Sequence, residues 1–152
     1  MNDVAITTAG LVSEAAWFDA CRVFVLKVLE KLGIDNWEVS ILFCDDSFIA
    51  ELNARYRGIE APTDVLSFSQ AGGEASPVPG GERRVLAGDI IISMAAMRRN
   101  AETAAVSENE EIKRLLIHGL LHLKGMDHEE ASSDMLSRQE NLLREFSKEK
   151  IV

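Results

Sequence analysis

The three histidines of the chain, His118, His122 and His128, all lie in one short run, HGLLHLKGMDH. Imidazole is the commonest protein ligand for zinc, and residues four apart on a helix lie one above the other on the same face. His118 and His122 therefore form a pair of metal ligands if this run is helical. Gly125 can end the helix by adopting a left-handed conformation, after which the chain can turn and supply His128.

Three imidazole nitrogens would leave a fourth tetrahedral position for water, which is typical of a catalytic rather than a structural zinc site. A single histidine is more often an ordinary core or surface residue, but the spacing of all three around a glycine favours the ligand interpretation. Nickel, copper and iron also bind three histidines, so the sequence favours zinc without fixing the metal.

Size and composition are those of one globular domain. The chain has 152 residues, of which 47% are hydrophobic and 27% charged. No apolar run approaches the length of about 20 residues that spans a bilayer. The N-terminus has no positively charged start followed by an apolar block, so we expect a cytoplasmic protein. Cys21 and Cys44 show no metal-type spacing, and we expect both to be reduced core residues.

The formal net charge of −9 argues against a nonspecific nucleic-acid-binding protein. All basic residues between 51 and 100 are nevertheless arginines, whose planar guanidinium groups suit bidentate contacts to phosphate. A locally positive wall beside the metal is one interpretation. Ordinary solvated arginines are the other, and we favour the latter for all except Arg57. The arginines concerned are Arg55, Arg57, Arg83, Arg84, Arg98 and Arg99.

Hydrophobic periodicity and turn residues predict alternating helices and strands within a single domain. Ser13 is the expected N-cap of the first helix, Gly58 the end of the second, and Ser107 with Glu110 a capping box for the histidine helix. We expect helices over 13–32, 45–57, 93–104, 107–124 and 132–148, strands over 37–43, 65–69 and 84–93, and a mobile loop over 71–82. The run of isoleucines at 90–92 predicts a strand near the centre of the sheet.

Gly119 is unusual, because glycine inside a helix costs about 1 kcal/mol relative to alanine. Either the helix packs closely against a neighbour at this position, or a side chain here would crowd the metal site or the substrate. The sequence does not separate these two explanations.

The histidine run resembles the signature of the metzincin metalloproteases, in which a helix supplies two histidines and a glycine turn leads to the third. Those proteases carry a glutamate directly after the first histidine as the general base, and this chain has Gly119 there. Peptide hydrolysis by that mechanism would lack its base.

A second resemblance covers far more of the chain. Three blocks are similar to those of the bacterial YbeY proteins and occur in the same order: LNARYRG at 52–58 with PTDVLSF at 62–68, GDIIIS at 88–93, and HGLLHLKGMDH at 118–128. Met126 stands where the family usually has tyrosine. The resemblance implies a single α+β domain over 1–152, with a mixed sheet of about four strands surrounded by five or six helices and a metzincin-like local topology.

The same resemblance implies a function. The family comprises zinc-dependent, single-strand-specific endoribonucleases that act in 16S rRNA 3′-end maturation and ribosome quality control, and its essential arginine corresponds to Arg57. Single-stranded RNA, ribosomal RNA and the small ribosomal subunit with its proteins are therefore the expected partners. One zinc ion would be held by His118, His122 and His128 and would activate water or polarise a phosphoryl oxygen, while Arg57 would clamp the phosphate.

The sequence does not identify a general base. Asp127, Glu129 and Glu130 follow the turn, but acids next to metal ligands usually orient imidazoles or face water, so we assign them no catalytic role. Two other functions are kept as alternatives: a metal-dependent amide or peptide hydrolase with a different base, and a noncatalytic ribosome-associated factor with a structural zinc.

Overall fold

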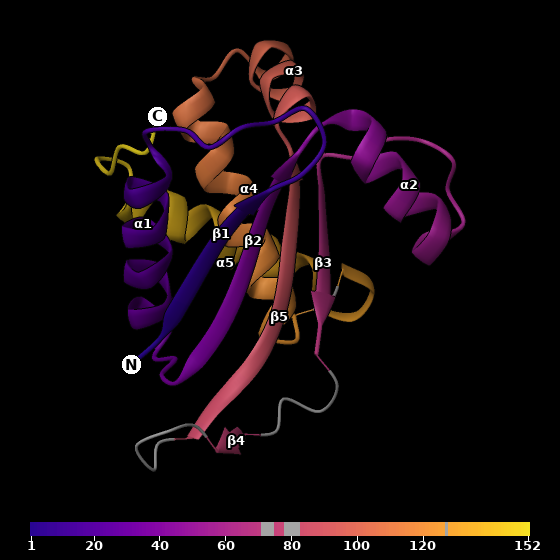
Figure 1. Cartoon of the computed structure of the whole chain (residues 1–152). Coiled ribbons are helices and arrows are strands. Elements are labelled where there is room, and N and C mark those ends of the chain that lie inside the picture. The colour runs from indigo at the N-terminus through magenta and orange to yellow at the C-terminus, as the bar shows by residue number, and fades with distance from the viewer. Residues whose placement is uncertain (71–74, 78–82, 127) are drawn as a thin grey trace.

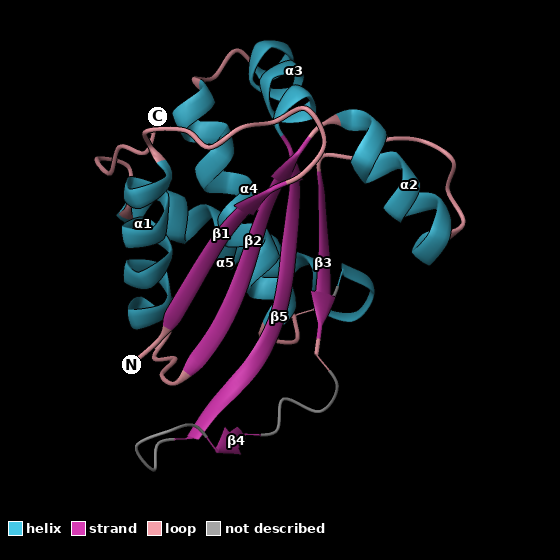
Figure 2. Cartoon of the chain, in the orientation of Figure 1, coloured by secondary structure: helices cyan, strands magenta, loops and turns pink. Residues whose placement is uncertain are grey.

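The computed structural model describes residues 1–70, 75–77, 83–126 and 128–152, of which 75–77, 83 and 128–133 are described by their backbone alone. Within these ranges the chain folds into one mixed sheet and five helices (Figures 1 and 2). This is the α+β architecture that the sequence predicts. No helix of the described residues is long and apolar enough to cross a membrane.

The sheet has the strand order β1-β2-β5-β3, with a short strand, β4, also paired to β5. Strands β1, β2 and β5 are parallel to one another, whereas β3 and β4 run antiparallel to β5. The bounds are β1 Asp3–Thr8, β2 Trp37–Cys44, β3 Val65–Ser69, β4 Ala75–Pro77 and β5 Arg83–Ser93. The isoleucine run therefore lies on an inner strand, as predicted.

Helices cover the two faces of the sheet unequally. The bounds are α1 Phe18–Lys31, α2 Asp46–Arg57, α3 Met94–Ala104, α4 Glu108–Leu123 and α5 His128–Glu145. Side chains from α1, α4 and α5 join those on one sheet face in the main core, where Ile41, Phe43 and Ile90 are fully buried. On the opposite face α2 covers only a small cluster around Ile49, Leu66 and Ile91. Much of this second face has no helix over it (Figure 1).

Several predicted boundaries were wrong. The first helix begins at Phe18, and Ser13 is not its N-cap: position 17 is the N-cap and makes no side-chain cap hydrogen bond. Aromatic packing explains the later start, because the Trp17 and Phe18 rings both contact Phe43, with ring centroids 5.2 Å apart in each pair. The segment before α1 instead crosses to α2, where the backbone N–H of Leu11 donates to Asp45 Oδ2.

Two strands were missed, and one helix begins earlier than predicted. Strand β1 was not predicted, and β4 lies in the segment expected to be a loop; the remainder of that segment, 71–74 and 78–82, lies outside the described residues. Helix α5 starts at His128, directly after the turn at Gly125, and ends at Glu145.

Both cysteines are free and buried, as expected. Burial raises the pKa of each thiol, Cys21 and Cys44, to about 12. Neither thiol is therefore ionised to any useful extent near neutral pH, and both act as core residues.

Candidate active site

Helix α4 carries the first two histidines, and a specific residue determines each of its ends. Ser107 caps its start, accepting a hydrogen bond from the backbone N–H of Glu110 at 3.0 Å, and three acidic residues occupy the first turn. At the other end Gly125 has φ +100°, and its N–H donates to the carbonyl of His122. The predicted cap and the predicted glycine turn are both confirmed.

His118 and His122 direct ring nitrogens at one point. Their Nε2 atoms lie 3.2 Å apart, and the ring centroids are separated by 4.7 Å. Two zinc-bound nitrogens at 2.0–2.1 Å from a tetrahedral ion are about 3.3 Å apart, so this separation fits a shared metal ion.

Gln139 lies within hydrogen-bonding distance of the first histidine and selects which of its ring nitrogens donates. Its Oε1 lies 2.8 Å from Nδ1 of His118, and the Gln139 residue, on α5, is 4% exposed. An amide oxygen can only accept, so Nδ1 of His118 donates and its Nε2 keeps a lone pair for a metal. The sequence analysis did not single out Gln139. Its position was a signal, however: Gln139 follows Met135 by four residues and so lies on the apolar side of the last helix, where a polar residue is unusual.

Arg57 lies in the same pocket as both histidines. The pocket has a volume of about 340 Å³ and is lined by Arg57 from the end of α2, residues 63–68 on and before β3, and His118 and His122 from α4. Gly58, the C-cap of α2 with φ +70°, ends the helix at this point and leaves the arginine exposed. Three of the four predicted site residues are therefore brought together from segments far apart in sequence.

The fourth predicted residue, His128, is placed only by its backbone, as the first residue of α5; its side chain lies outside the described residues. Asp127 and the side chains of Glu129 and Glu130 also lie outside them. Within the described part of the chain, no three His, Cys, Asp or Glu side chains form a group that could hold a metal ion. The role of His128 as third ligand stays a prediction.

Asp64 is a carboxylate of the pocket wall, and both of its oxygens accept hydrogen bonds. Oδ1 accepts from the backbone N–H of Val65 at 2.8 Å, and Oδ2 accepts from Asn100 Nδ2 at 3.0 Å. The Asp64 backbone carbonyl also accepts from Ser93 N–H. These bonds hold the start of β3 against β5 and α3, so Asp64 positions the wall beside the histidines.

Gly119 is explained by close packing. A Cβ atom built at this position would lie 2.8 to 3.0 Å from three side-chain atoms of Ile90, on β5. Real Cβ atoms do not approach so closely, so the helix can contact the sheet here only without a side chain. A glutamate at position 119, the general base of the metzincin mechanism, would meet the same obstruction.

Three of the other arginines of the middle segment form ion pairs and Arg55 is exposed, where the sequence favoured ordinary solvated arginines. Arg98 pairs with Glu108, and Arg99 makes a two-fold contact with Asp46 at 2.7 and 3.2 Å. Arg84 lies 3.4 Å from Asp3. The side chain of Arg83 lies outside the described residues.

Met126 is partly buried and packs against the main core. It stands where the YbeY proteins, which the sequence resembles, usually have tyrosine. Its side chain thus contributes apolar contact next to the glycine turn, where a tyrosine would add a hydroxyl group.

Comparisons with known proteins identify the family of this chain. Residues 7–147 match the family model described as Endoribonuclease YbeY. The endoribonuclease YbeY of Treponema denticola is 50% identical over 132 residues, covering 84% of each chain, and that of Treponema pallidum is 45% identical over 145 residues, covering 94% of this chain and 89% of the relative. The solution structure of TM1509 from Thermotoga maritima superimposes with a TM-score of 0.63 at 25% identity, covering 95% of this chain and 90% of that one. The chain described here belongs to the YbeY family of endoribonucleases.

Proposed function

We propose that this protein is a zinc-dependent, single-strand-specific endoribonuclease that acts in 16S rRNA 3′-end maturation and ribosome quality control in the cytoplasm. Family membership supports the coarser statement, a phosphodiester hydrolase with an RNA substrate involved in rRNA processing. The observation that carries the proposal is the 3.2 Å separation of His118 Nε2 and His122 Nε2 in a pocket that Arg57 also lines.

The donor set suits zinc. His118 presents a lone pair at Nε2 because its Nδ1 proton is donated to Gln139, and His122 presents Nε2 beside it. His128 is the proposed third ligand, at the start of the helix that follows the glycine turn. When bound, zinc would supply Lewis-acid polarisation of a phosphoryl oxygen.

Arg57 is proposed to bind and orient the scissile phosphate. Its guanidinium carries five N–H donors in a planar array that matches phosphate oxygens, and it forms no ion pair among the described residues that would compete. A fixed positive charge here would stabilise the negative charge that develops during phosphodiester cleavage.

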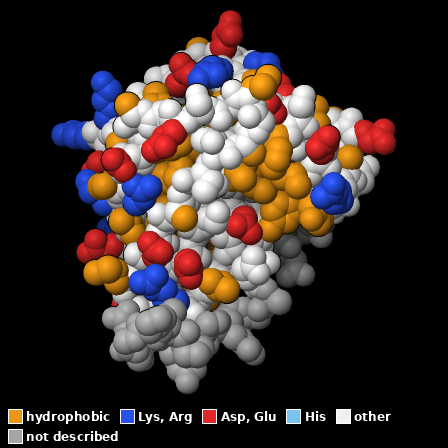
Figure 3. All heavy atoms as spheres, in the orientation of Figure 1, with side chains coloured by type: hydrophobic (Ala, Val, Ile, Leu, Met, Phe, Trp, Pro, Cys, Tyr) orange, Lys and Arg blue, Asp and Glu red, His pale blue; other side chains and the backbone are white. Residues whose placement is uncertain are grey.

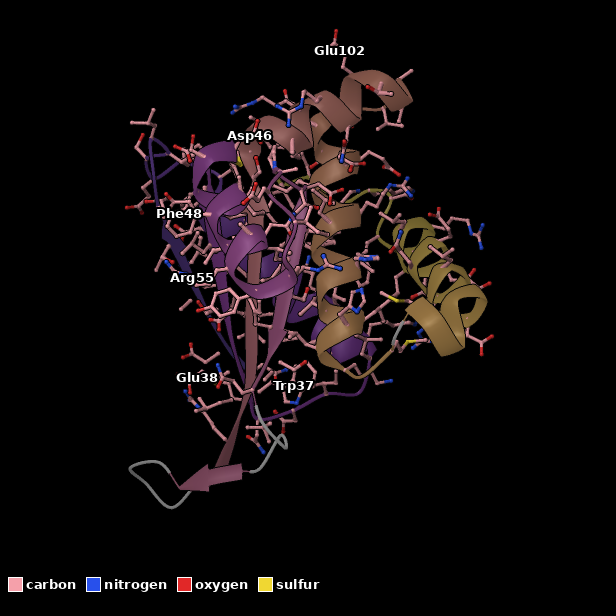
Figure 4. All side chains as sticks on the ribbon, turned by 90° about the vertical axis from the view of Figure 1, so that its right-hand side faces the viewer. Trp37, Glu38, Asp46, Phe48, Arg55 and Glu102 are labelled. Atoms are coloured by element: carbon pink, nitrogen blue, oxygen red, sulfur yellow. The ribbon has the colours of Figure 1, made fainter. Side chains whose placement is uncertain are left out.

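The test is cleavage of a single-stranded RNA by purified protein of measured zinc content, before and after chelation and zinc readdition. We expect His122→Ala to abolish cleavage and Arg57→Ala to lower kcat by about 10²- to 10³-fold, the effect of removing one charge-stabilising donor. Arg55→Ala is the matched control, because Arg55 is an exposed arginine of the same helix that does not line the pocket (Figure 4).

Two results would contradict the proposal. Undiminished cleavage by His122→Ala would assign the activity to a contaminant. A zinc site with four protein ligands, found by X-ray absorption spectroscopy, would instead support the noncatalytic alternative. Cosedimentation with small ribosomal subunits tests the proposed ribosomal partner.

A further inference from the structure

An apolar groove lies beside the candidate active site, between α2 and the face of the sheet that no other helix covers. Its volume is about 410 Å³. Helix α2 contributes residues four positions apart, Phe48, Leu52 and Tyr56, and the sheet contributes Leu42, Phe68 and Ile91. Figure 3 shows hydrophobic side chains gathered between the strands and α2 on this face.

The groove and the active-site pocket share a wall. Phe68 lines both of them. Tyr56 lines the groove and directly precedes Arg57, which lines the pocket. A chain bound with a phosphate at Arg57 would therefore have its neighbouring group at the groove.

The aromatic residues of the groove are arranged to receive a flat ring. Tyr56 is 61% exposed, and its ring contacts Phe68 edge-on, with centroids 5.3 Å apart at 63°. An edge-on contact leaves much of the tyrosine face uncovered, although exposed aromatic surface is costly in water. Ser40 and Asp89, at neighbouring positions of β2 and β5, add hydrogen-bonding groups to the otherwise apolar lining.

We propose that this groove binds one unpaired base of the RNA substrate, from the nucleotide next to the phosphate held at Arg57, by stacking on Tyr56. The inference rests on the proposed function and specifies how that site recognises its substrate. A base inside a duplex is already stacked and paired, and flipping it out costs about a few kcal/mol, so the groove favours a single strand.

The net charge of the chain favours such a contact. Phosphate neutralisation carries most nonspecific affinity for nucleic acids, and this chain has a formal net charge of −9. Short-range contacts can supply affinity that an acidic surface does not, and stacking on an aromatic side chain accepts any base.

The cut site in a short single-stranded RNA is first mapped with the wild-type zinc-loaded protein. The test then compares cleavage of this RNA with cleavage of two abasic RNAs. One lacks the base on the 5′ side of the cut site, and the other lacks the base on the 3′ side. We expect Tyr56→Ala to lower kcat/KM on the intact RNA about tenfold or more, the usual effect of losing one stacked base. Tyr56→Phe should stay within about twofold of wild type, because it keeps the ring. On one of the two abasic RNAs, Tyr56→Ala should match wild type, because the stacking partner is already missing.

Tyr56→Leu separates stacking from folding, since leucine fills the groove without an aromatic face; it should behave like Tyr56→Ala. Val23→Ala, which truncates an exposed apolar residue of α1, serves as the control and should match wild type. Equal losses by Tyr56→Ala on all three RNAs would overturn the inference. Cleavage of the intact RNA by Tyr56→Ala or Tyr56→Leu at the wild-type rate would also overturn the inference. The groove would then be assigned to a protein partner, and the proposed function would stand. A zinc-loaded wild-type protein that cleaves no RNA would overturn both.

Discussion

Gln139 on α5 accepts a hydrogen bond from Nδ1 of His118 on α4 at 2.8 Å, and so ties the last helix to the candidate metal site. Outer partners of this kind orient a ligand imidazole and select its tautomer, and their loss typically lowers metal affinity 10- to 100-fold. The buried amide is therefore predicted to affect the binding of a metal ion that it would not itself contact.

We predict that Gln139→Leu weakens zinc binding by about 10- to 100-fold while the protein remains folded. Competition with a chromophoric chelator measures the affinity, and circular dichroism checks the fold. Gln139→Glu is the matched variant: its carboxylate still accepts from Nδ1, so it should bind zinc at least as tightly as wild type. Unchanged affinity in Gln139→Leu would show that His118 needs no partner.

Gly119 should be intolerant of even one added carbon. We expect Gly119→Ala to destabilise the protein by up to about 2 kcal/mol, because overpacking against Ile90 costs about 1–3 kcal/mol and the gain in helix propensity offsets only about 1 kcal/mol of it. Chemical denaturation measures the free energy of unfolding.

A double-mutant cycle with Ile90→Ala tests the cause. Removing the isoleucine side chain takes away all three close atoms, so Gly119→Ala should be neutral or stabilising in that background. Equal destabilisation in both backgrounds would rule out this contact as the reason for glycine.

Local signals in the sequence were sufficient for the parts of the fold that depend on neighbouring residues. The Ser107 cap, the Gly58 stop and the turn at Gly125 were predicted because each is determined by one residue's side chain or backbone freedom. Pairing of His118 with His122 follows from helical spacing alone. Convergence of Arg57 on these histidines was inferred only from the resemblance.

Features that depend on distant partners were missed. Strand β1 is a short segment that mixes polar and apolar residues, and it forms a strand by pairing with β2. Next to this pair, the backbone N–H of Trp37 donates a hydrogen bond to Asn2 Oδ1. Helix α1 starts late because Trp17 packs on Phe43. Gln139 acts at the site because α5 packs against α4, and its polar position on the apolar side of the last helix was only a weak signal in the sequence.

Lys113 is fully buried and donates hydrogen bonds to the backbone of the segment that follows α5. Its Nζ donates to the backbone carbonyls of Phe146, Ser147 and Glu149, at 3.0, 3.4 and 3.1 Å. We predict that Lys113→Met lowers the free energy of unfolding by about 1–3 kcal/mol, because the three carbonyls lose their donor. Lys148→Met, at an exposed position, should change it by less than about 0.5 kcal/mol. Equal effects of the two substitutions in thermal and chemical denaturation would contradict this assignment.

Two carboxylates should make stability depend on pH in opposite directions. Hydrogen bonds from Arg99 hold the pKa of Asp46 below its usual value, at the point where α2 meets α3 (Figure 4). A lowered folded-state pKa stabilises the protein above the unfolded value of about 3.9, and this stabilisation is lost as the pH falls through the folded-state pKa. Asp46→Asn should therefore be less stable than wild type at pH 7, with the difference shrinking below about pH 4.

Glu111 should behave in the reverse way, because burial raises its pKa despite hydrogen bonds from Asn100 and Arg114. A raised folded-state pKa favours the folded protein fully below the unfolded value of about 4.3, and that contribution is lost as the pH rises through the folded-state pKa. Glu111→Gln should thus gain stability relative to wild type between about pH 4 and 7, and the gain should vanish in acid. Urea denaturation of both variants across pH 3–7 gives the two curves. A Glu111→Gln protein that becomes relatively less stable as the pH rises would show that the Arg114 ion pair outweighs burial.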